Sequence, residues 1–113
     1  MSLKFIAAVL LAPGIALAHH GWSEYDSSKP LKLTGRILES GYEHPHGYVK
    51  LDSAGKIYSV VLAPPSRMEF RGLTKEALKA GASVSIEGYA NRGKPEEVRA
   101  ERITANGKTV ELR

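Results

Sequence analysis

Four histidines are the residues of this 113-residue chain whose types and spacing could carry chemistry. They form two pairs, His19-His20 and His44-Pro45-His46, and the rest of the chain contains none. Neutral imidazole is the commonest protein ligand for copper, nickel and zinc. The chain has no cysteine, which excludes thiolate-ligated zinc and iron–sulfur sites. The pattern therefore predicts a metal site built from nitrogen ligands.

The first 18 residues have the order of parts of a secretory signal peptide. A positive start with Lys4 is followed by an apolar run from Phe5, and then by Ala16-Leu17-Ala18, a small-x-small cleavage site. The apolar stretch is 14 residues long, against about 20 for a membrane-spanning helix. We predict cleavage after Ala18, a periplasmic or secreted location, and no membrane span in the processed protein.

Cleavage at that point makes His19 the first residue of the mature chain. Its free amine and its ring could chelate one ion, and the ring of His46 could complete a T-shaped set of three nitrogens. This arrangement resembles the histidine brace of secreted copper proteins. Copper(II) is the favoured ion, because it prefers square-planar nitrogen sites and stands highest in the Irving–Williams order.

Two other histidines are alternative ligands. His20 offers a rival mode, in which the amine, a deprotonated peptide nitrogen and the His20 ring bind copper without a folded site. His44 is an alternative to His46. Pro45 disfavours a helical conformation at the preceding residue, so an extended segment is expected, with the rings of His44 and His46 on one side.

The elements that must position these residues are mainly strands. Alternating apolar residues predict strands over 31–38, 47–52, 56–62, 82–90, 98–105 and 108–112. Pro65 and Thr74 begin two short predicted helices, over 65–71 and 75–80. Gly35 predicts a bulge or bend in the first strand. The order predicts a mainly β protein, a five-stranded OB-like barrel over 31–113 with a short helical insert between strands 3 and 4.

Residues 19–30 form a polar, turn-rich N-terminal arm before the barrel. Trp22 and Tyr25 are its only sizeable apolar side chains. Such an arm is ordered only where something ties it down. We predict that Trp22 pins the arm to the barrel.

Several segments together resemble a known family. They are HHGWSEYD after the leader, the later HPH, LAPPSRMEFRGL, and the terminal RAERITANGKTVELR. They are similar to an uncharacterised family of small exported bacterial proteins. The resemblance implies export and a compact OB-like fold, and it carries no assigned activity. The family motif often reads NPH, which makes His44 the weaker ligand candidate of its pair.

Other function classes have less support in the sequence. An OB-like barrel suggests nucleic-acid binding, with Tyr48 and Tyr58 as stacking platforms. The formal charge of +4 is only mildly basic, and we expect no nucleic-acid partner for an exported protein. Arg67 and Arg71 lie four residues apart on a predicted helix and could bind an anion, although solvation or pairing with Glu69 and Asp52 is the simpler expectation.

These observations favour a binding protein rather than an enzyme. We expect a monomeric exported protein that binds a metal ion, most simply copper, for storage, delivery or sensing. The alternative is a metal-free module of the cell envelope, whose barrel face or basic rim recognises a ligand or a partner protein. We expect no catalytic residues.

Overall fold

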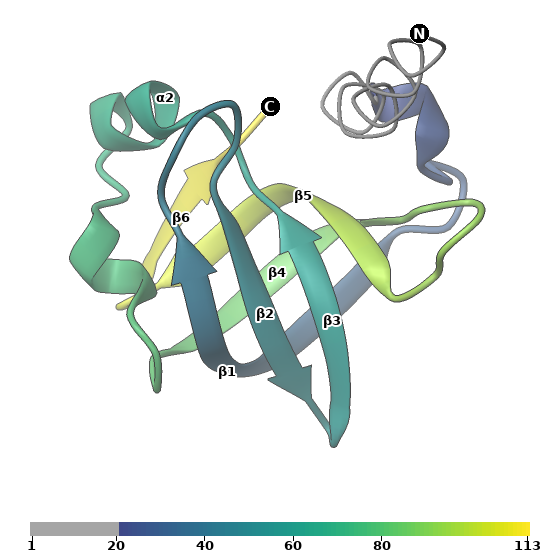
Figure 1. Ribbon diagram of the computed structural model, residues 1–113, viewed down its shortest axis with the longest axis horizontal. Coiled ribbons are helices and arrows are strands. Elements are labelled where there is room, and N and C mark those ends of the chain that lie inside the picture. The colour runs from purple at the N-terminus through teal and green to yellow at the C-terminus, as the bar shows by residue number, and fades with distance from the viewer. Residues whose placement is uncertain (1–20) are drawn as a thin grey trace, which may run out of the picture.

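The structure is a computed structural model that describes residues 21–113, and six strands dominate it. The strands are β1 (Leu31–Gly41), β2 (Tyr48–Ser53), β3 (Lys56–Val61), β4 (Ser83–Ala90), β5 (Glu97–Ala105) and β6 (Lys108–Glu111). Their order is β3-β2-β1-β4-β5-β6, and β3 also pairs with β5 in parallel (Figure 1). That pairing closes the first five strands into a barrel and leaves β6 as an additional strand. The predicted five-stranded OB-like barrel is confirmed.

Strand β1 serves two neighbours in turn. Its first half pairs with β4 and its second half with β2, and the change occurs at Arg36. A Cβ atom on Gly35 would clash with the backbone oxygen of Asp52 and lie 2.8 Å from its carbonyl carbon, so the two backbones approach too closely there for a side chain. The sequence predicts that Gly35 marks a bulge or a bend; the bulge lies instead at Leu38, where the register with β2 shifts.

The helical insert lies between β3 and β4, as predicted. It consists of α2 (Pro65–Phe70) and a short 3₁₀ helix, η2 (Lys75–Leu78). Met68 and Leu78 are buried and anchor these two turns on the barrel. The second element is shorter than predicted, and the Thr74 side chain makes no capping hydrogen bond.

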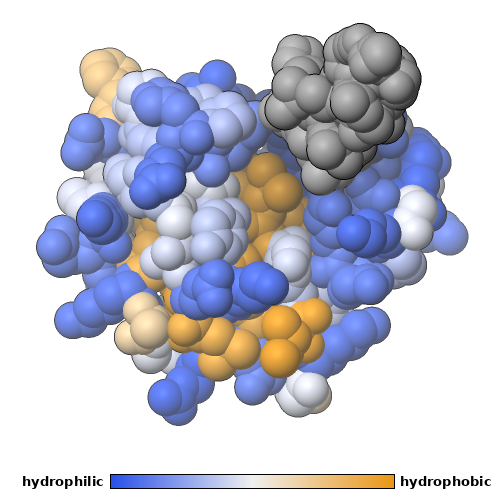
Figure 2. All heavy atoms as spheres, in the orientation of Figure 1, coloured by the Kyte–Doolittle hydropathy of each residue, from blue (hydrophilic) through white to orange (hydrophobic). Residues whose placement is uncertain are grey.

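The core fills the barrel and extends under the insert. In β2, Val49 and Leu51 are buried while Tyr48 and Lys50 are exposed, which is the alternation expected of a strand with one face in a core. Figure 2 shows polar residues over much of one outer face, with apolar residues gathered towards its lower edge. The largest fully buried side chains are Ile37, Leu51, Leu62, Met68, Leu78, Ile86, Ile103 and Leu112.

The N-terminal arm packs against the outer face of β4 and β5. The first element described in the arm is the 3₁₀ helix η1 (Trp22–Glu24). Tyr25 is only 2% exposed, and its hydroxyl donates a hydrogen bond to the Glu97 carboxylate. The backbone N–H of Asp26 donates to the oxygen of Ala90 at 2.9 Å. Tyr25 is therefore the buried anchor of the arm, and Trp22 adds a half-buried contact beside it.

No helix within residues 21–113 combines the length and the apolar character needed to cross a membrane.

Candidate functional site

Two of the four predicted ligands, His19 and His20, lie outside the described residues. His44 and His46 lie in the loop that joins β1 to β2. His44 and Pro45 form a bend, so the extended conformation predicted for this segment is wrong. The two rings have different surroundings, because His44 is exposed and His46 is half-buried.

The backbone next to His46 is fixed by Gly47. The Gly47 N–H donates to the oxygen of Ala63 at 2.9 Å, and its own oxygen accepts from the N–H of Leu62 at 2.9 Å. A Cβ atom at Gly47 would lie 2.6 Å from Cε of Met68 in α2. A glycine here therefore lets the loop press against the insert, and it holds His46 at the end of β3.

His46 points towards an arginine of the barrel wall. Its Nε2 atom lies 3.5 Å from Nη2 of Arg99, which is at the limit of a hydrogen bond. Arg99 lies on β5, opposite Val61 of β3 and Tyr89 of β4. Burial, followed by the positive charges of Arg99 and Arg67, holds the pKa of His46 below its usual value. The imidazole is therefore predominantly neutral at neutral pH.

Trp22 of the arm lies against the same arginine. The Arg99 guanidinium carbon is 4.5 Å from the centroid of the Trp22 ring, and that of Arg113 is 4.2 Å from it. Tyr89 meets the indole edge-on, with ring centroids 6.2 Å apart. Cations over an indole face are attracted by its electron-rich centre. The arm, the His46 loop, β5 and the last residue of the chain thus meet at one place.

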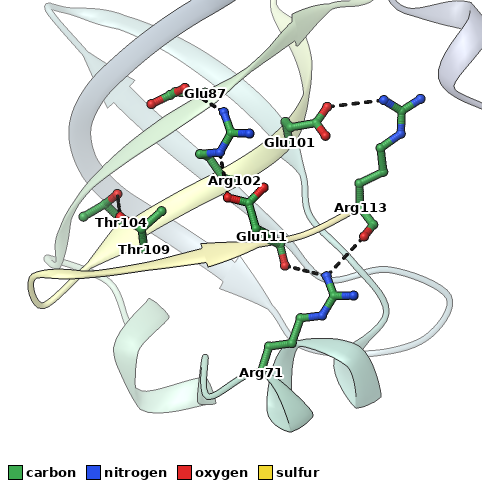
Figure 3. Close-up of polar contacts among 8 residues, drawn as sticks. All are labelled: Arg71, Glu87, Glu101, Arg102, Thr104, Thr109, Glu111 and Arg113. Atoms are coloured by element: carbon green, nitrogen blue, oxygen red, sulfur yellow. Dashed lines mark hydrogen bonds and ion pairs between the residues drawn. The ribbon is translucent and has the colours of Figure 1, made fainter.

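Four cationic or ionisable side chains from different segments gather there, and we call them the arginine cluster: His46, Arg67, Arg99 and Arg113. Arg67 of α2 donates through Nη1 to the backbone oxygen of Leu112 at 3.0 Å. Arg113 forms an ion pair with Glu101 at 3.4 Å (Figure 3). Burial lowers the pKa of Arg99, and the charges of Arg113 and Arg67 lower it further, although Tyr25 acts in the opposite direction.

Arg67 of α2 and its C-cap residue Arg71 have partners other than the predicted ones. Arg71 donates through Nη1 to the backbone oxygens of Glu111 and Arg113, at 2.8 and 3.1 Å (Figure 3). Like Arg67, it holds the end of the chain against the insert rather than pairing with Glu69. The Leu112 and Glu111 oxygens are neutral peptide carbonyls, so these two contacts satisfy N–H donors without cancelling positive charge.

Sequence reasoning did not find Arg99 and Arg113. Arg99 stands between Val98 and Ala100, two buried residues of β5, and this alternation is a signal that its side chain faces outwards. Its meeting with Trp22 and His46 joins residues 77 and 53 positions apart, which depends on barrel closure rather than on any local pattern.

Metal-ligating side chains form no cluster of three or more within the described part of the chain. Within residues 21–113, no group of three or more His, Cys, Asp or Glu side chains is arranged to hold a metal ion. His46 supplies one neutral imidazole.

The two tyrosines considered as stacking platforms do not share a surface. Tyr48 pairs with Val61 and is on the outer face of β2, whereas Tyr58 pairs with the buried Leu51 and packs against the core. Successive residues of paired strands alternate between faces, so these rings lie on opposite sides of the sheet.

Comparison with solved structures shows the fold. A complex of TiaS with a tRNA, AMPCPP and agmatine is 21% identical over 79% of this chain and 20% of that chain, with a TM-score of 0.53. The S. pombe Stn1–Ten1 complex is 16% identical over 70% of this chain and 59% of that chain, with a TM-score of 0.54. The match thus spans less than two-thirds of the length of each of those two chains, and no curated protein matches.

A comparison with family models bears on the family resemblance seen in the sequence motifs. The model of a family described as "Family of unknown function (DUF6152)" matches residues 8–99, which is most of the chain and includes both histidine pairs. The OB-like barrel and this match agree with the resemblance inferred from the motifs. The protein therefore belongs to this family of unknown function.

Proposed function

We propose that this is an exported copper-binding protein in which His19, through its amine and its ring, and His46 hold the metal. His20 and His44 are the alternative ligands. The observation that carries the proposal is the contact chain from His46 to Arg99 and from Arg99 to Trp22. Trp22 is two residues after His20, so the arm that bears the first pair is attached beside the second pair.

The state of His46 supports a role as ligand. Only the neutral imidazole has a lone pair to offer a metal, and burial and the nearby arginines favour that form by lowering the pKa. The same lone pair lies 3.5 Å from Arg99 when Nε2 is the acceptor. Metal binding through Nε2 therefore requires Arg99 to shift, whereas binding through Nδ1 does not.

The arginines also influence which ion the site prefers. A positive charge repels Cu²⁺ about twice as strongly as Cu⁺ at the same distance, because the Coulomb energy is proportional to the product of the charges. The cluster therefore weakens Cu²⁺ binding relative to a neutral site, and it favours the reduced ion. Storage, delivery or sensing in an exported protein is compatible with either oxidation state.

The test uses the protein as it is processed on export. Trp22 is the only tryptophan in the chain, and it lies beside the proposed site, so its fluorescence reports on copper there. We expect N-terminal sequencing to find His19 first, and copper to quench Trp22 with saturation at one equivalent. Substitution His46→Ala is expected to weaken binding strongly, and the matched His44→Ala to weaken it less.

Different results overturn different parts of this proposal. A mature chain that begins at any other residue removes the amine–imidazole chelate. Equal affinities of His46→Ala and the unmodified protein remove the third ligand. Protein that is metal-free after export and does not respond to copper excludes the metal function.

The second candidate is a metal-free binding module of the cell envelope. The arginine cluster favours it, because two guanidinium groups over one indole, with Arg67 bonded to the neighbouring Leu112, form a basic surface for an acidic ligand or partner. Metal content after export separates the two candidates.

A further inference from the structure

We propose that the arginine cluster is a binding site for a dianionic oxyanion, either inorganic phosphate or the phosphate group of a monoester. The inference deepens the second candidate function and rests on the cluster alone, so it holds whether or not copper binds. The ligand would lie where α2, the His46 loop, β5 and the end of the chain meet.

The charges of the cluster are held close together. Arg99 lies 3.5 Å from the His46 ring, and Arg99 and Arg113 both lie within 4.5 Å of the centroid of the same indole ring. Three guanidinium groups concentrate positive charge in this region. The Glu101 carboxylate lies 3.4 Å from one nitrogen of Arg113 and offsets part of this charge.

The positions of these groups are fixed before any ligand arrives. One nitrogen of Arg67 is used by the Leu112 oxygen, and the fork of a guanidinium carries further N–H donors. Arg113 and Arg99 pack against Trp22, and Gly47 fixes the loop of His46. A ligand that binds groups already in place loses less affinity to ordering of side chains.

The number of positive groups favours a dianion over a carboxylate. A monocarboxylate has one negative charge and two oxygens, whereas a phosphate group has up to two charges and three or four oxygens. Guanidinium groups match phosphate oxygens in a bidentate geometry that lysine lacks. Arginines that come from different segments can therefore be satisfied together by a tetrahedral oxyanion.

The experiment is a titration of metal-free processed protein, followed by Trp22 fluorescence and by calorimetry. The ligands are inorganic phosphate and phenyl phosphate, with acetate and chloride at equal ionic strength as comparisons. We expect one saturable site for phosphate or phenyl phosphate and no saturation with acetate or chloride. Tighter binding of phenyl phosphate identifies a monoester as the better ligand, and tighter binding of phosphate identifies the free ion.

Variants test whether the site is the cluster. Arg113→Gln and Arg67→Gln are each expected to weaken binding about tenfold, since each removes a charge-assisted hydrogen bond. The matched control is Arg36→Gln, which removes the same charge from β1 near the β2–β3 turn, opposite Asp52. We expect it to bind as the unmodified protein does. Circular dichroism of each variant verifies that the barrel is intact.

Three results would overturn the inference. The first is absence of saturable binding by both phosphate ligands, and the second is equal binding of acetate. The third is an equal loss in Arg36→Gln, which would mean that only net charge matters. Failure of copper binding leaves the inference intact, because the titration is performed without metal.

Discussion

Two arginines three residues apart on β5 have opposite surroundings. Arg102 lies between two carboxylates, with Nη1 2.8 Å from Glu87 and Nε 2.8 Å from Glu111 (Figure 3). Hydrogen bonds to Glu111 and Glu87 raise its pKa. Arg99 lies beside His46 and near Arg113, and burial and like charges lower its pKa.

The difference distinguishes a structural arginine from one suited to binding. The charge of Arg102 is balanced by neighbours on the adjacent strands β4 and β6, which are joined to β5 by regular pairing. Arg99 belongs to the arginine cluster, whose members come from the β1–β2 loop, α2, β5 and the end of the chain. Groups whose pKa is perturbed by burial and by like charges occur most often at functional sites.

Both arginines face outwards only because β5 contains a bulge between them. The register with β4 shifts where Gly88 pairs with Ala100 and Glu87 pairs with Arg102. In a regular strand, residues 99 and 102 would lie on opposite faces. The extra residue, Glu101, restores the outward direction at Arg102.

Gly88→Ala disturbs the bulge that turns both arginines outwards, and it has the largest expected effect on stability. A Cβ atom there would clash with the Arg99 oxygen and lie 2.9 Å from Cα of Ala100, both backbone atoms that cannot move without opening the bulge. We expect a loss of about 3 kcal/mol in the free energy of unfolding, measured in urea. The matched control is Gly21→Ala, because nothing lies within 4 Å of a Cβ atom at that position. Equal stability of the two variants contradicts the close approach.

We expect alkaline pH to lower the free energy of unfolding, because Tyr25 of the arm, near Arg99, loses its proton. Burial and the Glu97 carboxylate raise the pKa of Tyr25 to about 12, against about 10 in an unfolded chain. The neutral phenol is therefore favoured by folding. Its contribution is fully present below about pH 10 and is lost as the pH rises through about 12, a fall of about 2–3 kcal/mol.

The measurement is urea unfolding of the protein and of Tyr25→Phe across this pH range. The other tyrosines are present in both proteins, so their titration cancels in the difference. Tyr25→Phe is expected to be less stable at neutral pH, because it lacks the hydrogen bond to Glu97. Its disadvantage should shrink or reverse by about pH 12. A difference that stays constant with pH would show that the phenol does not titrate with folding.

The sequence was sufficient to predict most of the fold and little of the cluster. Alternating apolar residues are a local signal, and so is the Asn106-Gly107 pair, which is typical of a two-residue hairpin turn. Both residues of this pair adopt positive φ angles, of 53° and 75°. Residues of β5 carry the same local signal, which indicates the outward direction of Arg99. Nothing local indicates that Trp22 and Arg113 lie against it, because those contacts form only when the barrel closes.

The arm and the β1–β2 loop show the same limit. The composition of residues 19–30 suggested Trp22 as the pin, but Tyr25 is the residue that is buried, because its backbone bridges to Asn91 and its hydroxyl reaches Glu97. Pro45 favours an extended residue before it, yet tertiary anchors at Tyr42 and Gly47 require the loop to bend. The backbone conformation that a residue favours locally is overridden where tertiary contacts fix both ends of a loop.

Trp22→Leu tests the contacts around Arg99, and its expected effect on stability is smaller. It keeps an apolar side chain but removes the contacts with Arg99, Arg113 and Tyr89. We expect a loss of about 1–2 kcal/mol in the free energy of unfolding, followed by circular dichroism. Phe70→Leu is the control, because Phe70 is 91% exposed and its replacement should change nothing. An unchanged stability of Trp22→Leu would mean that the cations over the indole contribute nothing.

Arg102→Gln has the smallest expected effect. Its ion pairs with Glu87 and Glu111 are at the surface, where water and salt screen them, so the unfolding midpoint should fall only slightly. The difference should disappear in about 1 M salt, where the screening length is about 3 Å. Phosphate binding should be unchanged, although Arg102 is on the same strand as Arg99. If Arg102→Gln weakened phosphate binding as much as Arg113→Gln, the distinction between the two arginines would be lost, and total charge along β5 would be the better explanation.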